Sequence, residues 1–120
     1  MQNFAIVGKS ISVFSDFKTG YPIIYLNTFS DEGQKVFEAA QAAGCPPFTL
    51  VAISDLDWNH EMAPWDSPPG FKNAEPFTGG ANDYLRLLVD GIIPRAEKDL
   101  AGPPAWRGIA GYSLAGLFAL

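Results

Sequence analysis

The sequence predicts an α/β fold with a mainly parallel sheet flanked by helices. Two short, largely apolar runs, residues 22–26 and 48–53, are typical of strands that are covered on both faces. A stretch of helical period separates them, so the order is strand, helix, strand with short connections. Such a unit implies a right-handed crossover and a parallel pair of strands. The chain has 120 residues, 48% of them hydrophobic and 18% charged, which suits one globular domain with its own core.

The N-terminal segment, residues 4–15, is rich in Ile, Val and Phe and alternates in part with polar residues. Gly8 and Lys9 interrupt it, so it predicts one or two short strands, of which a hairpin is one arrangement. Residues 22–26 follow as the first strand of the parallel pair. They end at Asn27, where a connection to a helix is expected.

A helix is expected to follow this strand. Ser30 is the predicted N-cap, with Asp31 and Glu32 in the first turn, where the helix dipole favours acidic side chains. Gly44 ends the helix, because two prolines follow and cannot continue it. The face predicted to pack on the sheet carries Val36, Phe37, Ala40 and Ala43.

The second half of the chain begins with the strand 48–53 and a long segment, 54–80, without helical or strand periodicity. Loops of this length are uncommon in compact domains and usually serve a function. A helix capped by Asn82 or Asp83 is expected next, and it kinks or breaks at Pro94. A third buried strand over residues 105–110 and a helix from Leu114 follow it. The apolar face of the helix before Pro94 carries Tyr84, Leu85, Leu88, Val89 and Ile92.

The main candidate site lies where the last strand turns into the last helix. In the segment 111–116, Gly-Tyr-Ser-Leu-Ala-Gly, small residues flank Ser113 at the positions where a strand and a helix must approach closely. Such a turn projects the hydroxyl of Ser113 as a nucleophile, and the backbone N–H of Leu114 lies beside it as an oxyanion donor. The alternative interpretation is that Ser113 only caps the helix.

Three blocks of sequence resemble an esterase family of α/β-hydrolases. They are residues 21–26 (YPIIYL), Leu85 with Ile93-Pro94, and residues 107–117 (RGIAGYSLAGL). The family includes enterochelin esterases, feruloyl esterases, S-formylglutathione hydrolases and mycolyltransferases. The resemblance implies ester hydrolysis with Ser113 as nucleophile and the Leu114 N–H as one oxyanion donor. It implies a second donor in the segment 27–29, for which Thr28 is the candidate.

The sequence departs from this family at three places. Ala115 replaces the usual first glycine after the serine, and His60 begins a segment where many relatives have an Arg-x-x-x-Pro sequence. In the family an acidic residue and a histidine follow the serine, whereas neither follows Ser113 here. We therefore expect a partial α/β-hydrolase domain, truncated after the turn at Ser113, whose 120 residues alone are inactive because serine needs a base.

Two hypotheses follow from these departures. In the first, the 120 residues are part of an active serine esterase that acts on a small-molecule ester. In the second, the chain is a catalytically inactive binding or assembly module. Its unfinished sheet edge then needs a partner chain, through a homo-oligomer or a domain swap, because open edges pair readily.

The segment 54–80 supplies further candidates for the site. Trp58, Trp65, His60 and, from the turn itself, Tyr112 are predicted to line the substrate pocket. His60 as a catalytic base and the two tryptophans as a mere cover of the sheet edge are the alternatives. The acidic residues of this segment match no known metal-binding loop, so we predict a solvated loop without a metal.

Composition narrows the class of protein. A net charge of −5 and a pI near 4.6 argue against nucleic-acid binding. The sequence contains neither an apolar run of membrane-spanning length nor a signal peptide, so no membrane association is expected. A single cysteine, Cys45, forms no internal disulfide and suits a reduced, cytoplasmic setting. No cofactor is predicted.

Overall fold

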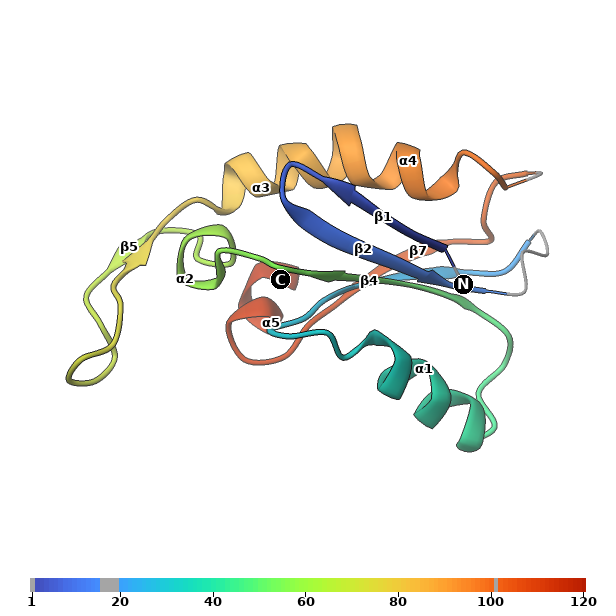
Figure 1. Cartoon of the computed structure of the whole chain (residues 1–120), viewed down its shortest axis with the longest axis horizontal. Coiled ribbons are helices and arrows are strands. Elements are labelled where there is room, and N and C mark those ends of the chain that lie inside the picture. Colours follow the sequence, from blue (N-terminus) through green and yellow to red (C-terminus); the bar gives the residue numbers. More distant parts are fainter. Residues whose placement is uncertain (1, 16–19, 101) are drawn as a thin grey trace.

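A five-stranded sheet forms the centre of the protein. The computed structural model describes residues 2–15, 20–100 and 102–120. The sheet has the strand order β1-β2-β4-β3-β7 (Figure 1). Strands β3, β4 and β7 are mutually parallel, whereas β1 with β2 and β2 with β4 are antiparallel. The sheet is therefore mixed, made of β1 (Gln2–Ile6), β2 (Lys9–Phe14), β3 (Ile23–Asn27), β4 (Thr49–Ser54) and β7 (Arg107–Ala110).

The N-terminal segment forms a hairpin. Val7 and Gly8 connect β1 to β2, and both have positive φ, 49° and 79°. Two central residues with positive φ are the mark of a tight turn whose twist matches the twist of the flanking strands. Of the arrangements that the sequence left open for residues 4–15, the structure has the two-stranded one.

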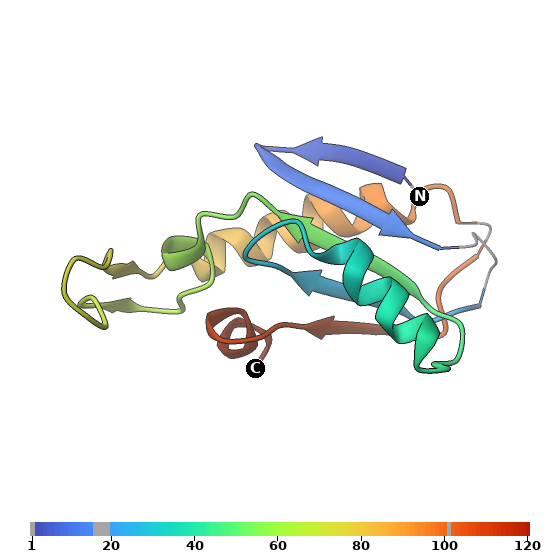
Figure 2. The same cartoon turned by 60° about the horizontal axis from the view of Figure 1, so that its bottom comes forward.

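Helices cover both faces of the sheet. Figures 1 and 2 show α1 on one face and the long helical segment from α3 to α4 on the other. The α/β architecture with parallel strands and flanking helices, predicted from the sequence, is confirmed. The helices are α1 (Gly33–Ala42), α2 (Trp58–Glu61), α3 (Ala81–Leu87), α4 (Ile93–Glu97) and α5 (Leu114–Ala119), with a π-helical turn (Leu88–Ile92) between α3 and α4.

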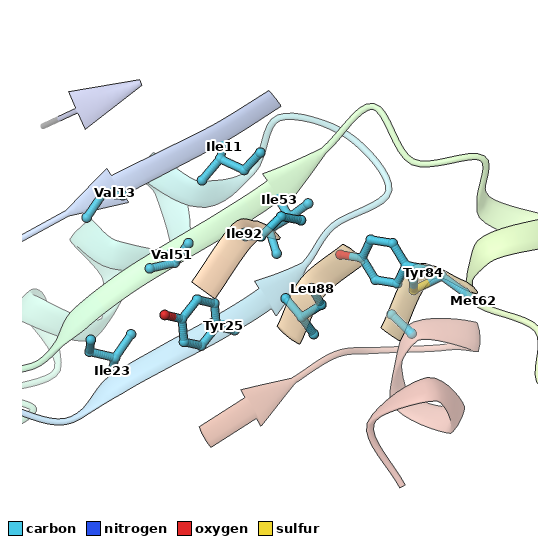
Figure 3. Close-up of a cluster of buried hydrophobic side chains, with 11 residues drawn as sticks. Ile11, Val13, Ile23, Tyr25, Val51, Ile53, Met62, Tyr84, Leu88 and Ile92 are labelled. Atoms are coloured by element: carbon cyan, nitrogen blue, oxygen red, sulfur yellow. The ribbon is translucent and has the colours of Figure 1, made fainter. Parts of the chain in front are cut away.

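Alternation along the strands produces two cores. Successive residues of β3 and β4 point to opposite faces, so each of these strands contributes to both. Figure 3 shows the larger core, which lies between the sheet and the helical segment from α3 to α4. Its buried residues are Ile11, Val13, Ile23, Tyr25, Val51, Ile53, Met62, Tyr84, Leu88, Ile92 and Ala115. The smaller core contains Phe14, Leu26, Leu50 and Ala52, and Phe37 of α1 packs on it.

The start of helix α1 differs from the prediction. Ser30 is not the N-cap; Glu32 is, and the helix begins at Gly33. Both the amide and the hydroxyl of Ser30 donate to the Glu32 carboxylate, at 3.2 and 3.1 Å, so Ser30 is bound to that side chain. Gly33 sits directly on the sheet, because a Cβ at this position would lie 2.5 Å from the Cβ of Ala52. Of the predicted apolar face, Phe37 and Ala40 are half-buried, whereas Val36 and Ala43 are exposed.

Helix α3 begins earlier than predicted, and Pro94 does not break the helical segment. Gly80 is the N-cap in place of Asn82 or Asp83. The amides of Gly80 and Ala81 donate to the carbonyls of residues 60 and 63, so the preceding loop satisfies them. Before Pro94 the helix widens into a π turn, in which the Ile93 N–H reaches back to the Leu88 carbonyl. Proline has no N–H to donate, and the wider turn lets the chain continue as α4.

The long segment 54–80 is not wholly irregular. It contains α2 and a two-stranded ribbon of β5 (Asp66–Ser67) and β6 (Phe77–Thr78). Figures 1 and 2 show the chain between these strands projecting away from the sheet. We call residues 66–78 the arm. No helix of the described residues has the length and apolar character needed to cross a membrane.

Strand β7 is a sheet edge and not the buried strand that its apolar sequence predicts. Among the described strands it pairs only with β3, and Arg107 and Ile109 are exposed. Polar side chains attach β7 to helix α4. The Arg107 guanidinium donates two hydrogen bonds to Glu97 of α4, at 2.8 and 2.6 Å, and the Tyr25 hydroxyl donates a third at 2.5 Å.

This Glu97 cluster predicts a pH dependence of stability. Burial alone would raise the pKa of Glu97, but hydrogen bonds from Arg107 and Tyr25 and the charge of Arg107 outweigh it and lower the pKa. A pKa below the ordinary value of 4.5 means that the cluster stabilises the fold above about pH 4.5 and that this contribution is lost as the pH falls. In urea unfolding, the midpoint of wild type should fall more from pH 7 to pH 3.5 than that of Glu97→Gln. Glu38→Gln removes an exposed carboxylate of α1, and its urea midpoint should fall between pH 7 and pH 3.5 by as much as that of wild type. An equal fall of the midpoint in Glu97→Gln and in wild type would contradict the prediction.

Candidate active site

The turn between β7 and α5 holds Ser113 in an unusual backbone conformation. Strand β7 ends at Ala110, α5 begins at Leu114, and Ser113 between them has φ 52° and ψ −127°. Residues with a side chain rarely adopt this conformation, which costs about 1–3 kcal/mol and persists only where the surroundings impose it. The side chain of Ser113 caps no backbone amide of α5. The geometry therefore does not fit the alternative of a simple helix cap.

Close packing explains two of the small residues around Ser113, Gly111 and Ala115. A Cβ at Gly111 would lie 2.4 Å from the carbonyl oxygen of Ala115, so only glycine fits there. A Cβ at Gly116 would meet its nearest neighbour at 3.4 Å, an ordinary contact. The methyl group of Ala115 is fully buried. The turn thus accommodates the alanine that departs from the family pattern.

Two backbone amides border the turn. Leu114 is the first residue of α5, so its N–H has no acceptor within the helix. The N–H of Thr28, the predicted second donor, already has an acceptor: it donates to the Ile53 carbonyl at 2.9 Å and extends the pairing of β3 with β4. The next amide, that of Phe29, instead donates to the Tyr112 hydroxyl at 3.1 Å. Phe29 therefore replaces Thr28 as the amide that faces the turn.

Tyr112 ties the turn to the segment before α1. Its hydroxyl accepts the Phe29 N–H and donates to the Glu32 carboxylate at 2.6 Å. This last hydrogen bond lowers the pKa of Glu32, and burial together with the same carboxylate raises the pKa of Tyr112. Sequence reasoning missed this role of Glu32, because an acidic residue just before a helix is equally explained by the helix dipole.

A cleft of about 720 Å³ opens at Ser113. Ser113, Leu114 and Leu117 line it from the turn and α5, Trp58 lines it from α2, and residues of the arm form much of the remaining wall. The ring of Phe29 stands edge-on to Trp58 with their centroids 5.3 Å apart, and Trp58 lies 5.9 Å from Tyr112. The full lining is Phe29, Asp57, Trp58, Asn59, Gly70, Phe71, Asn73, Ala74, Glu75, Phe77, Ser113, Leu114 and Leu117.

The other residues predicted for the pocket lie elsewhere. Trp65 lines a smaller adjoining cavity of about 180 Å³ and is 61% exposed. His60 is not among the described residues that line the cleft. Its Nδ1 lies 2.7 Å from the Thr78 hydroxyl, and its ring fills the space that a side chain at Gly80 would need. His60 thus joins α2 to the base of the arm, and this placement does not favour it as a base for Ser113.

The acidic residues of segment 54–80 are dispersed. Glu61 forms an ion pair with Lys9 at 2.7 Å and also accepts the Asp57 N–H, while Asp55 accepts the Ser10 hydroxyl. Within residues 2–15, 20–100 and 102–120, no three His, Cys, Asp or Glu side chains are grouped so that they could hold a metal ion.

The fold of this chain is also found in solved structures of other proteins. No protein-family model and no curated protein matches the chain in sequence. The solved structures that match include the BES protein from Bacillus cereus, with a TM-score of 0.71 and 19% identity over 98% of this chain, and the siderophore hydrolase EstA from Aspergillus nidulans, with a TM-score of 0.60 and 15% identity over 92%. These matches cover 55% and 46% of the two solved chains. The chain therefore shares the fold of these proteins, an α/β sheet with parallel strands and flanking helices, over a length that corresponds to about half of each solved chain.

Proposed function

We propose that the cleft hydrolyses carboxylic esters with Ser113 as the nucleophile. The observation that carries the proposal is the backbone of Ser113, whose positive φ lies between a strand and a helix at the edge of a cleft. A serine held in this way presents its Oγ to a bound acyl group. Oγ attacks the carbonyl carbon while its proton passes to a base, and the alcohol leaves with a proton. Water then releases the acid from the acyl-enzyme.

The amides of Leu114 and Phe29 are the proposed oxyanion donors. Backbone N–H groups aimed at the developing oxyanion contribute much of the rate enhancement in acyl transfer. The Phe29 N–H now binds an oxygen atom, the Tyr112 hydroxyl, and a substrate oxygen would replace it. The loop that carries Phe29 is held by Glu32 through Ser30 and Tyr112.

The 120 residues need an external base for this reaction. The sequence has one histidine, His60, which binds Thr78, and no histidine or acidic residue follows Ser113. A positioned base contributes about 10²–10⁴-fold to such a step. Added imidazole can act in its place, because it reaches an open cleft by diffusion.

Covalent labelling tests the proposed nucleophile. With an alkyl fluorophosphonate, intact mass spectrometry should show one adduct on Ser113, and the labelling rate should rise with imidazole concentration. Ser113→Ala should lose the adduct, whereas Ser12→Ala, on strand β2, should label as wild type does. Equal labelling of Ser113→Ala, or no adduct at high imidazole concentration, would refute the nucleophile.

Among the described strands β7 pairs on one side only, with β3, and this favours a second candidate function, that of an assembly module. Unpaired strand edges are templates for another chain, and Ile109 is an exposed apolar side chain on this edge. On this proposal a second copy pairs with β7, and light scattering after size exclusion should show a dimer at about 100 µM. Ile109→Lys should be monomeric, whereas Val36→Lys, at an exposed apolar residue of α1, should remain dimeric. A monomer at all concentrations would exclude this function.

A further inference from the structure

The structure assigns the cleft at Ser113 a preference for esters that carry a positively charged group beside a flat, apolar body. This inference rests on the proposed function, since it names the substrate class of the same site. The residues that line the cleft combine aromatic rings with carboxylates, and these are the groups that attract a cation.

Aromatic side chains provide the apolar walls. Phe29, Trp58, Phe71 and Phe77 all line the cleft, and Phe29 and Phe71 are 66% and 76% exposed. Phe29 and Trp58 lie nearly perpendicular to each other, with their ring centroids 5.3 Å apart, and both line the cleft. The face of an aromatic ring attracts a cation placed within about 6 Å of its centre, most strongly for Trp. Flat, apolar groups also stack on such surfaces.

The charged side chains of the lining all have the same sign. Asp57 lies next to Trp58, and Glu75 comes from the arm. Within the described chain, neither carboxylate takes part in an ion pair, and no side chain donates a hydrogen bond to either. Both charges are therefore available to a ligand, and the net charge of −5 for the whole sequence acts in the same direction.

Positive side chains are absent from the described lining. Lys72 lies between two lining residues of the arm, Phe71 and Asn73, but does not itself contribute to the cleft. An anionic ligand would meet Asp57 and Glu75 without a compensating cation, whereas a quaternary ammonium group would meet ring faces and carboxylates together. The cleft is thus expected to discriminate between ligands of the same size by their charge.

Binding of small probes tests this preference separately from catalysis. The Ser113→Ala chain, which cannot be acylated, is titrated with benzyltrimethylammonium, benzyl alcohol and phenylacetate, and the Trp58 indole signal is followed by NMR. The cation should bind about tenfold more tightly than phenylacetate, with benzyl alcohol between them. The preference should weaken between 50 and 500 mM NaCl, because salt screens exposed charges.

Matched variants show which groups cause the preference. The double change Asp57→Asn and Glu75→Gln should reduce the ratio of cation to anion affinity to about twofold or less, because the carboxylates are its source. Asp31→Asn with Glu38→Gln removes two carboxylates that line a separate groove and should leave the ratio unchanged. Trp58→Leu should weaken binding of the cation more than binding of the alcohol, because the ring attracts the cation in addition to its apolar contact, in this case read from the arm resonances.

The outcomes separate the two proposals. Phenylacetate bound as tightly as the cation, or a double variant with the wild-type ratio, would overturn the charge preference. Turnover of wild type is then compared for benzoylcholine and for a benzoate ester with an anionic alcohol group, in the presence of imidazole. A cation preference in binding without an acyl-enzyme would remove the serine chemistry and leave the charge preference standing. Turnover without a cation preference would leave the serine chemistry standing and remove the charge preference.

Discussion

Gly111→Ala is expected to abolish labelling of Ser113 and to lower the free energy of unfolding by about 1–3 kcal/mol. The added methyl group would lie 2.4 Å from the Ala115 carbonyl oxygen and 2.8 Å from the Ala115 Cβ. Neither neighbour can move away alone, since Ala115 is fully buried in the first turn of α5. The strand and the helix must separate, and the backbone that holds Ser113 at positive φ relaxes with them. Urea unfolding and fluorophosphonate labelling measure the two effects.

Gly116→Ala is the matched control for this variant. Its methyl group would find its nearest neighbour at 3.4 Å, and the residue lies within helix α5. Alanine in a helix interior is more stable than glycine by roughly 0.5–1 kcal/mol, so this variant should be as stable as wild type or more so, and it should still label. Similar losses in both variants would show that close packing at Gly111 is not what holds the turn.

Tyr84→Phe is expected to destabilise the fold by about 1–3 kcal/mol through a single lost hydrogen bond. The Tyr84 hydroxyl donates to the Asn27 side-chain carbonyl, and both residues are almost completely buried. The Asn27 side-chain NH₂ group already has no partner among the described residues. Removing the hydroxyl leaves the whole amide unpaired next to the segment that carries Phe29. We therefore expect slower labelling of Ser113 as well as a lower urea midpoint.

A second substitution distinguishes this cause from a simple packing defect. In the Tyr84→Phe background, Asn27→Leu removes the unpaired amide and should recover part of the lost stability, because two apolar partners cost less than one orphaned polar group. Tyr21→Phe, at a half-buried tyrosine, should unfold as wild type does. A double variant less stable than Tyr84→Phe would show that the hydrogen bond is not the origin of the loss.

The features that local sequence determines were predictable. The runs 22–26 and 48–53 are apolar at every or nearly every position, and such strands must be covered on both faces wherever they lie. The turn at Ser113 is likewise determined by six consecutive residues, 111–116. The close approach that excludes a side chain at Gly111 involves Ala115 of the same segment.

Features that depend on distant partners were not predictable. The Thr28 amide is used because β4 continues beside it to Ile53, a register that no pattern within residues 27–29 reveals. Strand β7 has the composition of a buried strand, yet its exposure depends on what lies beside it. His60 lies in the segment 54–80 that was expected to line the pocket, but its ring position follows from the fit against Thr78 and Gly80, 18 and 20 residues further along.

The strand order also has a kinetic consequence. The two sides of the proposed oxyanion site meet only when β7 pairs with β3, which places Leu26 opposite Ala110 and brings Phe29 to Tyr112, 83 residues away in sequence. Closing so long a loop costs more conformational entropy than closing the β1–β2 hairpin, and parallel pairings between distant strands form slowly. We therefore expect the hairpin and the helices to form first and the reactive serine to mature last, so that a folding intermediate would be compact and yet chemically silent.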